Sequence, residues 1–533
     1  MNETLHAEGV ADTGAEGDRP PEGWAWPAIG EVTELNPSKP SRNALPGDAP
    51  VTFVPMPAVD AARGSINAPE ERPFHEVRKG YTAFRDEDVI FAKITPCMEN
   101  GKVAIARGLM NGLGFGSTEF HVLRPSGAVI SEYLYHFLRQ TTFRQTAEAQ
   151  MTGSVGQKRV PADFLTKAAL PLPPRCEQQR IVAQVERLLA RVDAARERIA
   201  KLPALLKRFR QAILAAACSG RLTADWRENR QSAESATALL DSVLARRRTL
   251  MGDSSTRPYK DPPPPELSDL ADLPEEWAVA SMEQLTCLVT SGSRGWAKYY
   301  ADSGPFFIRA QNVKTDRLIL DEAAHVQPPD GAEGRRTQIR YGDLLITITG
   351  ANVTKSALVE SDPGEAYVSQ HLALIRPVDP STSPCLYLWT VSPVHGRAKL
   401  TSDAYGAGKP GLNLDNIRTM AVGLPPVAEQ REIVRRVDAL FSLADALERR
   451  AAAATAHTDR LTQAILAKAF RGELVPTEAE LARREGRPYE SAVELLARIQ
   501  AERPTSPARR PRRRAGSPRR RARQAKPLSP ISR

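Results

Sequence analysis

The chain carries one block of sequence twice, and this repeat limits the folds that it can adopt. Residues 172–222 match residues 424–474 at a constant offset of 252, and 23 of the 51 aligned positions are identical. The match begins with LPPRCEQQRIV against LPPVAEQREIV and ends with QAILAAACSGRL against QAILAKAFRGEL. Chance does not produce such a match without a gap, so the chain consists of two related halves.

Each copy of the block has the residue spacing of a long amphipathic helix. Apolar residues recur alternately every four and every three positions, the a/d pattern that presents one apolar stripe to a partner helix. Gly220 and Gly472 stand where the helices are expected to end, and Pro203 is expected to kink or break the first copy. The residues predicted to form the stripe, which we call the helix-pairing seam, are Ile181, Val185, Leu188, Val192, Ile433, Val437, Leu440 and Leu447.

A more variable, strand-rich segment precedes each helical block. EDVIFAKIT at 87–95 parallels GDLLITITG at 342–350, and FHVLRP at 120–125 parallels LALIRP at 372–377. The sequence therefore predicts an α+β fold with an internal repeat, in which β-rich domains alternate with long helices. The expected divisions are a disordered acidic N-terminus (1–20), a first β-rich domain (21–171), a first helical block (172–256), a Pro-rich linker (257–273), a second β-rich domain (274–423), a second helical block (424–502) and a basic disordered tail (503–533).

The net charge of +10 is located almost entirely in the tail. Residues 503–533 contain 12 Lys and Arg and no Asp or Glu, whereas residues 1–502 contain 61 basic and 63 acidic residues. The overall charge is therefore weak support for nucleic-acid binding by the β-rich domains. The tail itself is expected to add only nonspecific affinity for polyanions that weakens with salt.

The sequence lacks the common motifs of catalysis, metal binding and membrane insertion. It has no GxxxxGK[ST], HExxH or GxSxG motif, and its five cysteines are never spaced as CxxC. No apolar run is long enough to span a membrane, and the N-terminus is acidic. We therefore expect a non-catalytic, cytoplasmic chain that binds no metal and no cofactor of its own.

Polar loops in the two β-rich domains are candidates for contact with DNA. Lys and Arg neutralise phosphates, while Arg, Lys, Asn and Gln can bond to base edges. Such residues follow apolar strands or occupy Gly-rich loops in segments 93–107, 154–159, 293–300, 309–312, 348–359 and 405–411. The candidates are Lys93, Thr95, Lys102, Gln157, Lys158, Arg159, Arg294, Lys298, Arg309, Asn312, Asn352, Lys355 and Lys409.

The order of these parts resembles one known family. A variable unit, an LPPxxEQ[RQ]xIV helix ending in QAIL, a second variable unit and a second such helix are similar to the specificity (S) subunit of type I restriction-modification systems, the HsdS family. The resemblance covers residues from about 21 to 500. It implies that the β-rich domains are target-recognition domains, separated by two antiparallel coiled-coil helices in a pseudo-two-fold arrangement.

The resemblance also implies a function and partners. Each domain of such a subunit reads one half of a bipartite, asymmetric site in double-stranded DNA. The helices set the gap between the halves and bind two modification subunits, which methylate adenine with S-adenosylmethionine, and restriction subunits join to cleave DNA with ATP and Mg. These cofactors are expected in the partner subunits and not in this chain.

Two alternatives remain open from the sequence alone. The chain could be a coiled-coil scaffold whose β-rich domains bind proteins, which sequence-specific DNA binding at moderate salt would contradict. It could also be a self-contained restriction enzyme or methyltransferase, which would be active by itself with S-adenosylmethionine.

Overall fold

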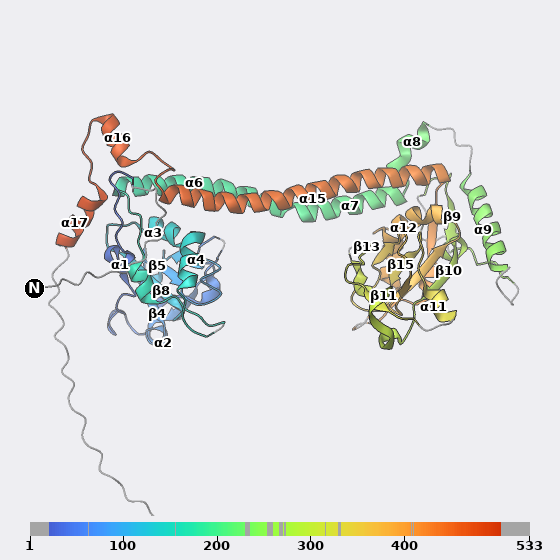
Figure 1. Ribbon diagram of the computed structural model, residues 1–533, viewed down its shortest axis with the longest axis horizontal. Coiled ribbons are helices and arrows are strands. Elements are labelled where there is room, and N and C mark those ends of the chain that lie inside the picture. Colours follow the sequence, from blue (N-terminus) through green and yellow to red (C-terminus); the bar gives the residue numbers. More distant parts are fainter. Residues whose placement is uncertain are drawn as a thin grey trace, which may run out of the picture. The chain divides into compact units, whose positions relative to one another are not determined.

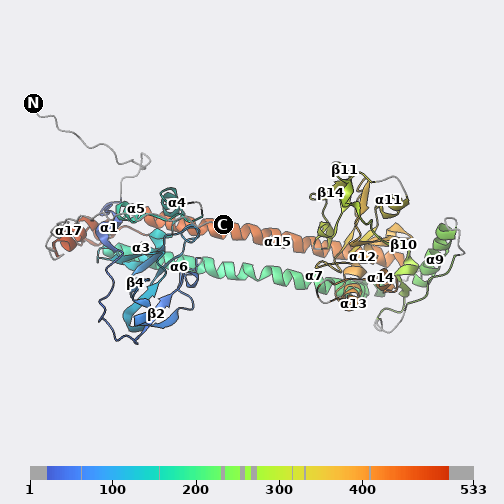
Figure 2. The same cartoon turned by 90° about the horizontal axis from the view of Figure 1, so that it is seen from below.

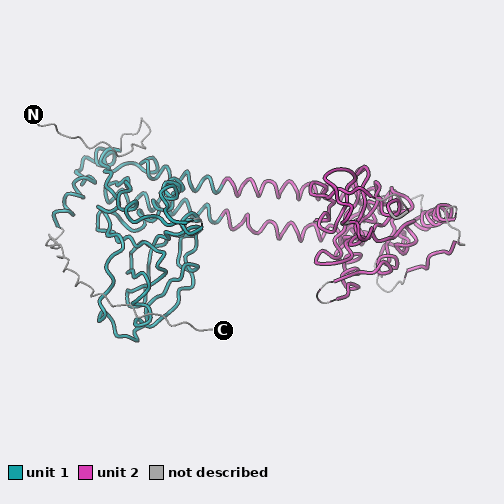
Figure 3. The backbone as a smooth tube through the Cα atoms, turned by 60° about the horizontal axis from the view of Figure 1, so that its bottom comes forward, with its two compact units in different colours: residues 1–194, 458–533 teal, residues 195–457 magenta. Residues whose placement is uncertain are grey.

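The computed structural model describes residues 21–502, except 62, 155, 230–234, 253–258, 266–269, 271–272, 315, 329–331, 407 and 409. The predicted disordered N-terminus, the basic tail, parts of the Pro-rich linker and Lys409 therefore lie outside the described residues. The chain divides into two compact units (Figure 3). Unit 1 comprises residues 1–194 and 458–533, and unit 2 comprises residues 195–457.

Unit 1 contains two four-stranded sheets, with strand orders β1-β8-β5-β6 and β3-β2-β7-β4. Strands β4, β5 and β8 of these sheets are labelled in Figure 1. Strands β2 and β7 are parallel, whereas β5 pairs antiparallel with β6 and β8. The strands are β1 (Thr33–Leu35), β2 (Pro50–Val54), β3 (Glu70–Pro73), β4 (Thr82–Arg85), β5 (Val89–Ala92), β6 (Val103–Ile105), β7 (Leu113–Gly116) and β8 (Phe120–Pro125). The short helices are α1 (Ile29–Val32), α2 (Phe74–Val77), α3 (Ser131–Leu138), α4 (Thr141–Ala149), α5 (Ala162–Lys167), α16 (Glu478–Glu485) and α17 (Ala492–Glu502).

Unit 2 contains a sheet of order β10-β18-β15-β16 and a sheet of order β14-β11-β17, in which β11 and β17 are parallel. The strands are β9 (Ala278–Ser281), β10 (Thr286–Ser291), β11 (Tyr300–Ile308), β12 (Val313–Lys314), β13 (Arg317–Leu318), β14 (Ala324–Val326), β15 (Leu344–Thr347), β16 (Ser356–Leu358), β17 (Ala366–Val368), β18 (Leu372–Pro377) and β19 (Ala421–Leu424). The helices are α8 (Ala224–Glu228), α9 (Ala236–Gly252), α10 (Met282–Leu285), α11 (Ala332–Thr337), α12 (Ser383–Val391), α13 (Gly396–Asp403) and α14 (Leu414–Arg418).

The long helices are α6 (Arg175–Ala200), α7 (Leu202–Cys218) and α15 (Val427–Phe470). The first repeat copy is interrupted at Lys201, because Pro203 lies in the first turn of α7, where proline is tolerated, and not inside one continuous helix. The second copy has no proline there and forms a single helix of 44 residues, about 66 Å long at 1.5 Å per residue. None of the helices among the described residues is long and apolar enough to cross a membrane.

The two units repeat the same supporting framework. The sheet β1-β8-β5-β6 corresponds strand for strand to β10-β18-β15-β16, and the parallel pair β2–β7 corresponds to β11–β17. An ion pair with a buried carboxylate also recurs, since Arg124 binds Asp88 at 2.7 Å and Arg376 binds Asp343 at 2.6 Å. The fold is therefore mixed α and β, as the sequence predicts.

One helix in each unit links a sheet to the long helices. In unit 2, α12 contacts β16, and it also contacts α7, which is labelled near it in Figure 2. In unit 1, α3 contacts β5 and β6, and its Tyr133 and Phe137 rings lie 4.9 and 5.5 Å from the ring of Phe470 in α15. Each sheet is thus fixed to its own part of the helical scaffold.

The helices run antiparallel where they pair inside unit 2. Arg210 of α7 binds Asp445 and Glu448 of α15 at 2.6 and 2.7 Å. Arg436 precedes these two residues in α15 and bonds to the carbonyl of Leu222, which follows the end of α7. Rising residue numbers on one helix therefore meet falling numbers on the other.

Candidate nucleic-acid interface

Two loops that the sequence indicated separately lie side by side in unit 1. The loop after β5 begins at Lys93, whose carbonyl accepts a 2.9 Å bond from Val160 N, and Thr95 N donates to the carbonyl of Lys158 at 3.0 Å. Backbone bonds between Thr152 and Arg159 close the second loop. The structure thus brings Lys93, Thr95 and Lys102 to the same edge as Gln157, Lys158 and Arg159.

Unit 2 repeats this arrangement with different residues. The loop after β15 meets the 405–411 loop through a bond from Gly350 N to the carbonyl of Pro410 and a bond from Leu412 N to the carbonyl of Ile348, both 2.9 Å. Tyr405 and Gly411 bond to each other through their backbones, and the side chain of Tyr405 is 62% exposed. Asn352 and Lys355 lie in the first of these loops, and Lys409 of the second is outside the described residues.

The edge of unit 2 extends to two more segments. Ser293 N bonds to the carbonyl of Val368 at 2.9 Å, and Gln370 N bonds to the carbonyl of Ser293 at 3.0 Å. Ser369 N bonds to the carbonyl of Ile308, which precedes Arg309, and Ile348 N bonds to the carbonyl of His371. Arg294 and Arg309 therefore lie at the same edge of unit 2 as Asn352, although β11 and β15 belong to different sheets. We call this edge, with loops 292–295, 309–312, 348–355, 369–371 and 405–411, the unit 2 loop edge.

Four of the candidates are already held by bonds inside the protein. Lys102 Nζ donates to the carbonyl of Met56 at 2.8 Å, and Thr95 Oγ1 donates to Glu99 at 2.8 Å. Arg159 binds both carboxylate oxygens of Glu119 at 2.9 Å, which lowers the pKa of Glu119 and raises that of Arg159. Asn312 is 2% exposed and uses its amide to bind Arg309 N and the carbonyl of Ile319.

Other candidates are exposed or partly exposed. Gln157, Lys158, Arg294 and Lys298 are exposed, and the ammonium of Lys298 lies 4.9 Å from the centre of the Tyr299 ring. Lys93, Asn352, Lys355 and Arg309 are partly exposed. His121, beside this edge in unit 1, is 5% exposed and bonds to Asn36 and to the carbonyl of Val160, and burial lowers its pKa. His121 is thus a bonded structural residue.

The helix-pairing seam is buried in most positions. Ile181, Val185 and Val192 belong to the unit 1 core, with Ile465 and Leu466 of α15. Ile433 and Val437 belong to the unit 2 core, which also includes Ile213 and Leu214 of α7. Leu188 and Leu440 are partly buried against these cores, whereas Leu447 is 37% exposed.

Sequence reasoning missed two buried carboxylates, one in each unit, at the starts of the long helices. Trp24 Nε1 donates to Glu177 at 2.9 Å, and Trp277 Nε1 donates to Glu429 at 3.0 Å. Both glutamates come from the EQ of the repeated LPPxxEQ motif. Both tryptophans come from a second repeated motif, PExW, which is PEGW at 21–24 and PEEW at 274–277. In both halves the PExW motif precedes the LPPxxEQ motif at nearly the same distance along the chain, and this recurrence was the signal that could have predicted the contact.

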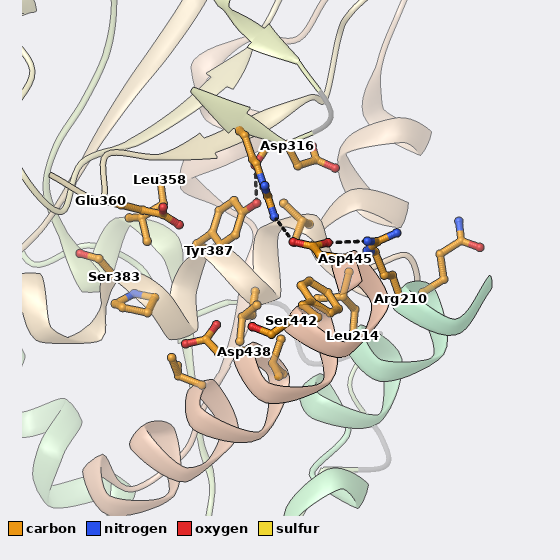
Figure 4. A pocket seen from close by; sticks show the side chains of 18 of the residues that line it. Arg210, Leu214, Asp316, Leu358, Glu360, Ser383, Tyr387, Asp438, Ser442 and Asp445 are labelled. Carbon is orange, nitrogen blue, oxygen red and sulfur yellow. Dashed lines mark hydrogen bonds and ion pairs between the residues drawn. The ribbon is translucent and has the colours of Figure 1, made fainter. Parts of the chain in front are cut away.

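A cleft of about 1010 Å³ lies in unit 2 between α7, α15 and α12 (Figure 4). Asp445 in its wall binds both Arg210 at 2.6 Å and Arg317 at 3.2 Å. Tyr387 donates to the carbonyl of Asp316, whose carboxylate binds Arg397. These charged groups in the wall are therefore paired with one another. Among the described residues, no group of three or more His, Cys, Asp and Glu side chains could hold a metal ion.

Comparison with known proteins identifies relatives of the whole arrangement. Residues 21–204 and 335–454, together more than half of the chain, match the family described as Type I restriction modification DNA specificity domain. The chain is 31% identical over 362 residues to the type I restriction enzyme EcoBI specificity subunit of Escherichia coli, covering 67% of this chain and 69% of that protein. It is 26% identical over 484 residues to the EcoEI specificity subunit of Escherichia coli, covering 81% of this chain and 80% of that protein.

Solved structures share the fold. The HsdS subunit from Thermoanaerobacter tengcongensis aligns with a TM-score of 0.54 and 23% identity, covering 86% of this chain and 99% of that one. A chain from a structure described as "Structural basis underlying complex assembly and conformational transition of the type I R-M system" aligns with a TM-score of 0.58 and 23% identity, covering 86% of this chain and all of that one.

Proposed function

Because the chain belongs to the type I restriction-modification DNA specificity family, we propose that it is the subunit that selects the DNA sequence on which such a complex acts. The observation that carries this proposal is the loop edge built twice on one framework. In both units a loop after the central strand of a four-stranded sheet bonds to a second, glycine-containing loop. Polar side chains on such paired loops suit contact with phosphates and base edges.

The two edges present different side chains, which supports the proposal that the chain reads a bipartite, asymmetric DNA site. The unit 1 edge presents Gln157 and Lys158, whereas the unit 2 edge presents Arg294, Asn352 and Tyr405. Because direct readout depends on donor and acceptor patterns, unlike side chains on like frameworks would select unlike half-sites.

The long helices are proposed to set the spacing of the half-sites. The proposed arrangement is two target-recognition domains separated by two long antiparallel coiled-coil helices, with pseudo-two-fold symmetry. Support comes from the 44-residue helix α15, which contributes to both units, and from its antiparallel pairing with α7 inside unit 2. Dimeric DNA readers commonly bind half-sites about 34–36 Å apart, which is shorter than such a helix.

The chemistry is proposed to reside in partner subunits. In this proposal the chain is non-catalytic and binds double-stranded DNA, two modification subunits and restriction subunits. The modification subunits methylate adenine with S-adenosylmethionine, and the restriction subunits use ATP and Mg.

Mapping of methylated adenines tests this function. The full chain, assembled with its modification subunits, is given a random duplex DNA library and S-adenosylmethionine, and methylated sites are sequenced. We expect two specified half-sites separated by an unspecified gap. Exchange of residues 21–171 for the same segment of another family member should change one half-site only. A single continuous site, no sequence preference, or a change in both halves would contradict the proposal.

A further inference from the structure

Arg309 occupies a distinctive place on the unit 2 loop edge. It follows strand β11 directly, and its neighbour Ile308 bonds through its carbonyl to Ser369 N at 2.8 Å. Its backbone is fixed, because Arg309 N donates to the buried side-chain oxygen of Asn312 at 3.0 Å. The base of the Arg309 side chain is therefore held rigidly at the sheet edge.

The guanidinium of Arg309 has little to bind within the protein. Its one hydrogen bond among the described residues is a long contact of 3.4 Å from Nη2 to the carbonyl of Glu322. Nε is buried without a hydrogen-bond partner, and no carboxylate pairs with the group among the described residues. Because Nε is enclosed by the protein, the N–H groups of the two Nη atoms are the ones that a ligand can reach.

An aromatic surface supports the guanidinium. The Arg309 Cζ atom lies 5.9 Å from the centre of the Tyr300 ring, which is 46% exposed. Tyr300 in turn packs edge-on against Phe307, and Phe307 stacks on the buried Trp296. Cation–π contact at this distance orients a guanidinium without using its N–H donors.

We propose that Arg309 reads a guanine in the half-site of unit 2, with two N–H groups donating to O6 and N7 of that base. This inference rests on the proposed function and names the contact that would give one position of the site its identity. Bidentate arginine–guanine pairing is the commonest specific contact in the major groove, and it needs a rigid, unpaired guanidinium. Arg309 has that form, whereas Arg159 on the unit 1 edge is occupied by Glu119.

The corresponding position of unit 1 cannot make this contact. The pair Phe53-Val54 of β2 matches Phe307-Ile308 of β11, so Pro55 stands where unit 2 has Arg309. The guanine contact therefore belongs to one half-site only.

The test compares Arg309→Lys and Arg309→Ala with the parent chain in the full complex with its modification subunits. The half-site of unit 2 is the one that stays unchanged when residues 21–171 are exchanged. The DNA library is randomised in that half-site, and methylated sites are sequenced. We expect the parent to prefer guanine at one position by about 10- to 100-fold, the range for a good bidentate contact. Arg309→Ala should lose that preference and keep every other position, and Arg309→Lys should reduce the preference, because an ammonium group lacks the planar fork of two donors. Lysine retains the charge, so a phosphate contact would survive in Arg309→Lys.

Replacement of that guanine by 7-deazaguanine removes N7 and gives a second readout. The parent should methylate the modified site about tenfold less well, and Arg309→Ala should be indifferent to the replacement. Arg340→Lys is the matched control, because Arg340 is exposed in the same unit before the start of β15, at the strand end away from the loop edge.

Three results would overturn the inference while leaving the proposed function intact. They are a half-site without a G·C pair, an unchanged preference in both Arg309 variants, and a uniform loss of methylation at all sequences. Absence of any sequence preference in the parent complex would instead overturn the proposed function, and this inference with it.

Discussion

The indole Nε1 of Trp277 donates a 3.0 Å hydrogen bond to the carboxylate of Glu429, which is 1% exposed. Thr223 also donates to this carboxylate, and Arg227 pairs with it. In unit 1, Trp24 Nε1 and the backbone N–H of Glu478 donate to Glu177. The repeated PExW and LPPxxEQ motifs therefore meet, and each contact fixes the start of a β-rich domain to the start of a long helix.

Loss of the indole donor should destabilise the chain at the unit 1 junction. Trp24→Phe keeps an aromatic ring but leaves one oxygen of the buried Glu177 carboxylate without its donor, which should cost about 1–3 kcal/mol in the free energy of unfolding. Trp26→Phe is the matched control, because Trp26 is 52% exposed and its replacement should stay within about 0.5 kcal/mol. Urea unfolding of the full chain measures both values. Equal costs for the two variants would contradict the role given to the Trp24–Glu177 bond.

The same carboxylate should make stability depend on pH. Burial raises the pKa of Glu177 above its usual value, although the bonds from Glu478 N and Trp24 oppose the shift. At pH values between the ordinary glutamate pKa and the raised pKa, the folded chain therefore holds a proton on Glu177 that the unfolded chain has released. Stability from this group is present at the acidic side of that interval and falls as the pH rises through it.

Glu177→Gln should remove this component. The difference in unfolding free energy between the parent and Glu177→Gln should shift in favour of the parent as the pH is lowered toward the ordinary glutamate pKa. Urea unfolding at a series of pH values from about 4.5 to 7 measures the difference. Curves that stay parallel would show that Glu177 has the same pKa in the folded and unfolded chains.

The sequence predicts the framework better than it predicts the loops. The offset of 252 and the a/d spacing depend on local periodicity, so the long helices and the burial of Ile181 and Val437 follow from them. The roles of Lys102 and Asn312 depend on segments brought together by the fold: Met56 lies 46 residues before Lys102 in the chain. A basic or amide side chain on a loop therefore looks the same in the sequence whether it faces solvent or binds a distant carbonyl.

The exposure of the seam changes along α15 and gives a matched pair of substitutions. Leu440 packs against the unit 2 core, so Leu440→Asp buries an unpaired charge and should cost about 2–3 kcal/mol. Leu447, two turns later, is 37% exposed, and Leu447→Asp should cost less than about 1 kcal/mol. Urea unfolding checks the two values. Size-exclusion chromatography with the modification subunits should show assembly lost in the first variant and kept in the second, and assembly retained by Leu440→Asp would contradict the proposed spacing role of the helices.

Lys158 and Lys102 lie on the same edge of unit 1 but should respond differently to removal of their charge. Lys158 is exposed, so Lys158→Ala should weaken DNA binding to all sequences alike and reduce the slope of log K against log salt by about 1, the effect of one lost phosphate contact. Lys102 donates to the carbonyl of Met56, so Lys102→Ala should leave the salt slope unchanged and instead lower the free energy of unfolding by about 1 kcal/mol. Fluorescence titration of labelled duplex DNA at several salt concentrations measures the slopes. A slope reduced by the same amount in both variants would contradict this difference and show that Lys102 releases the Met56 carbonyl to contact phosphate.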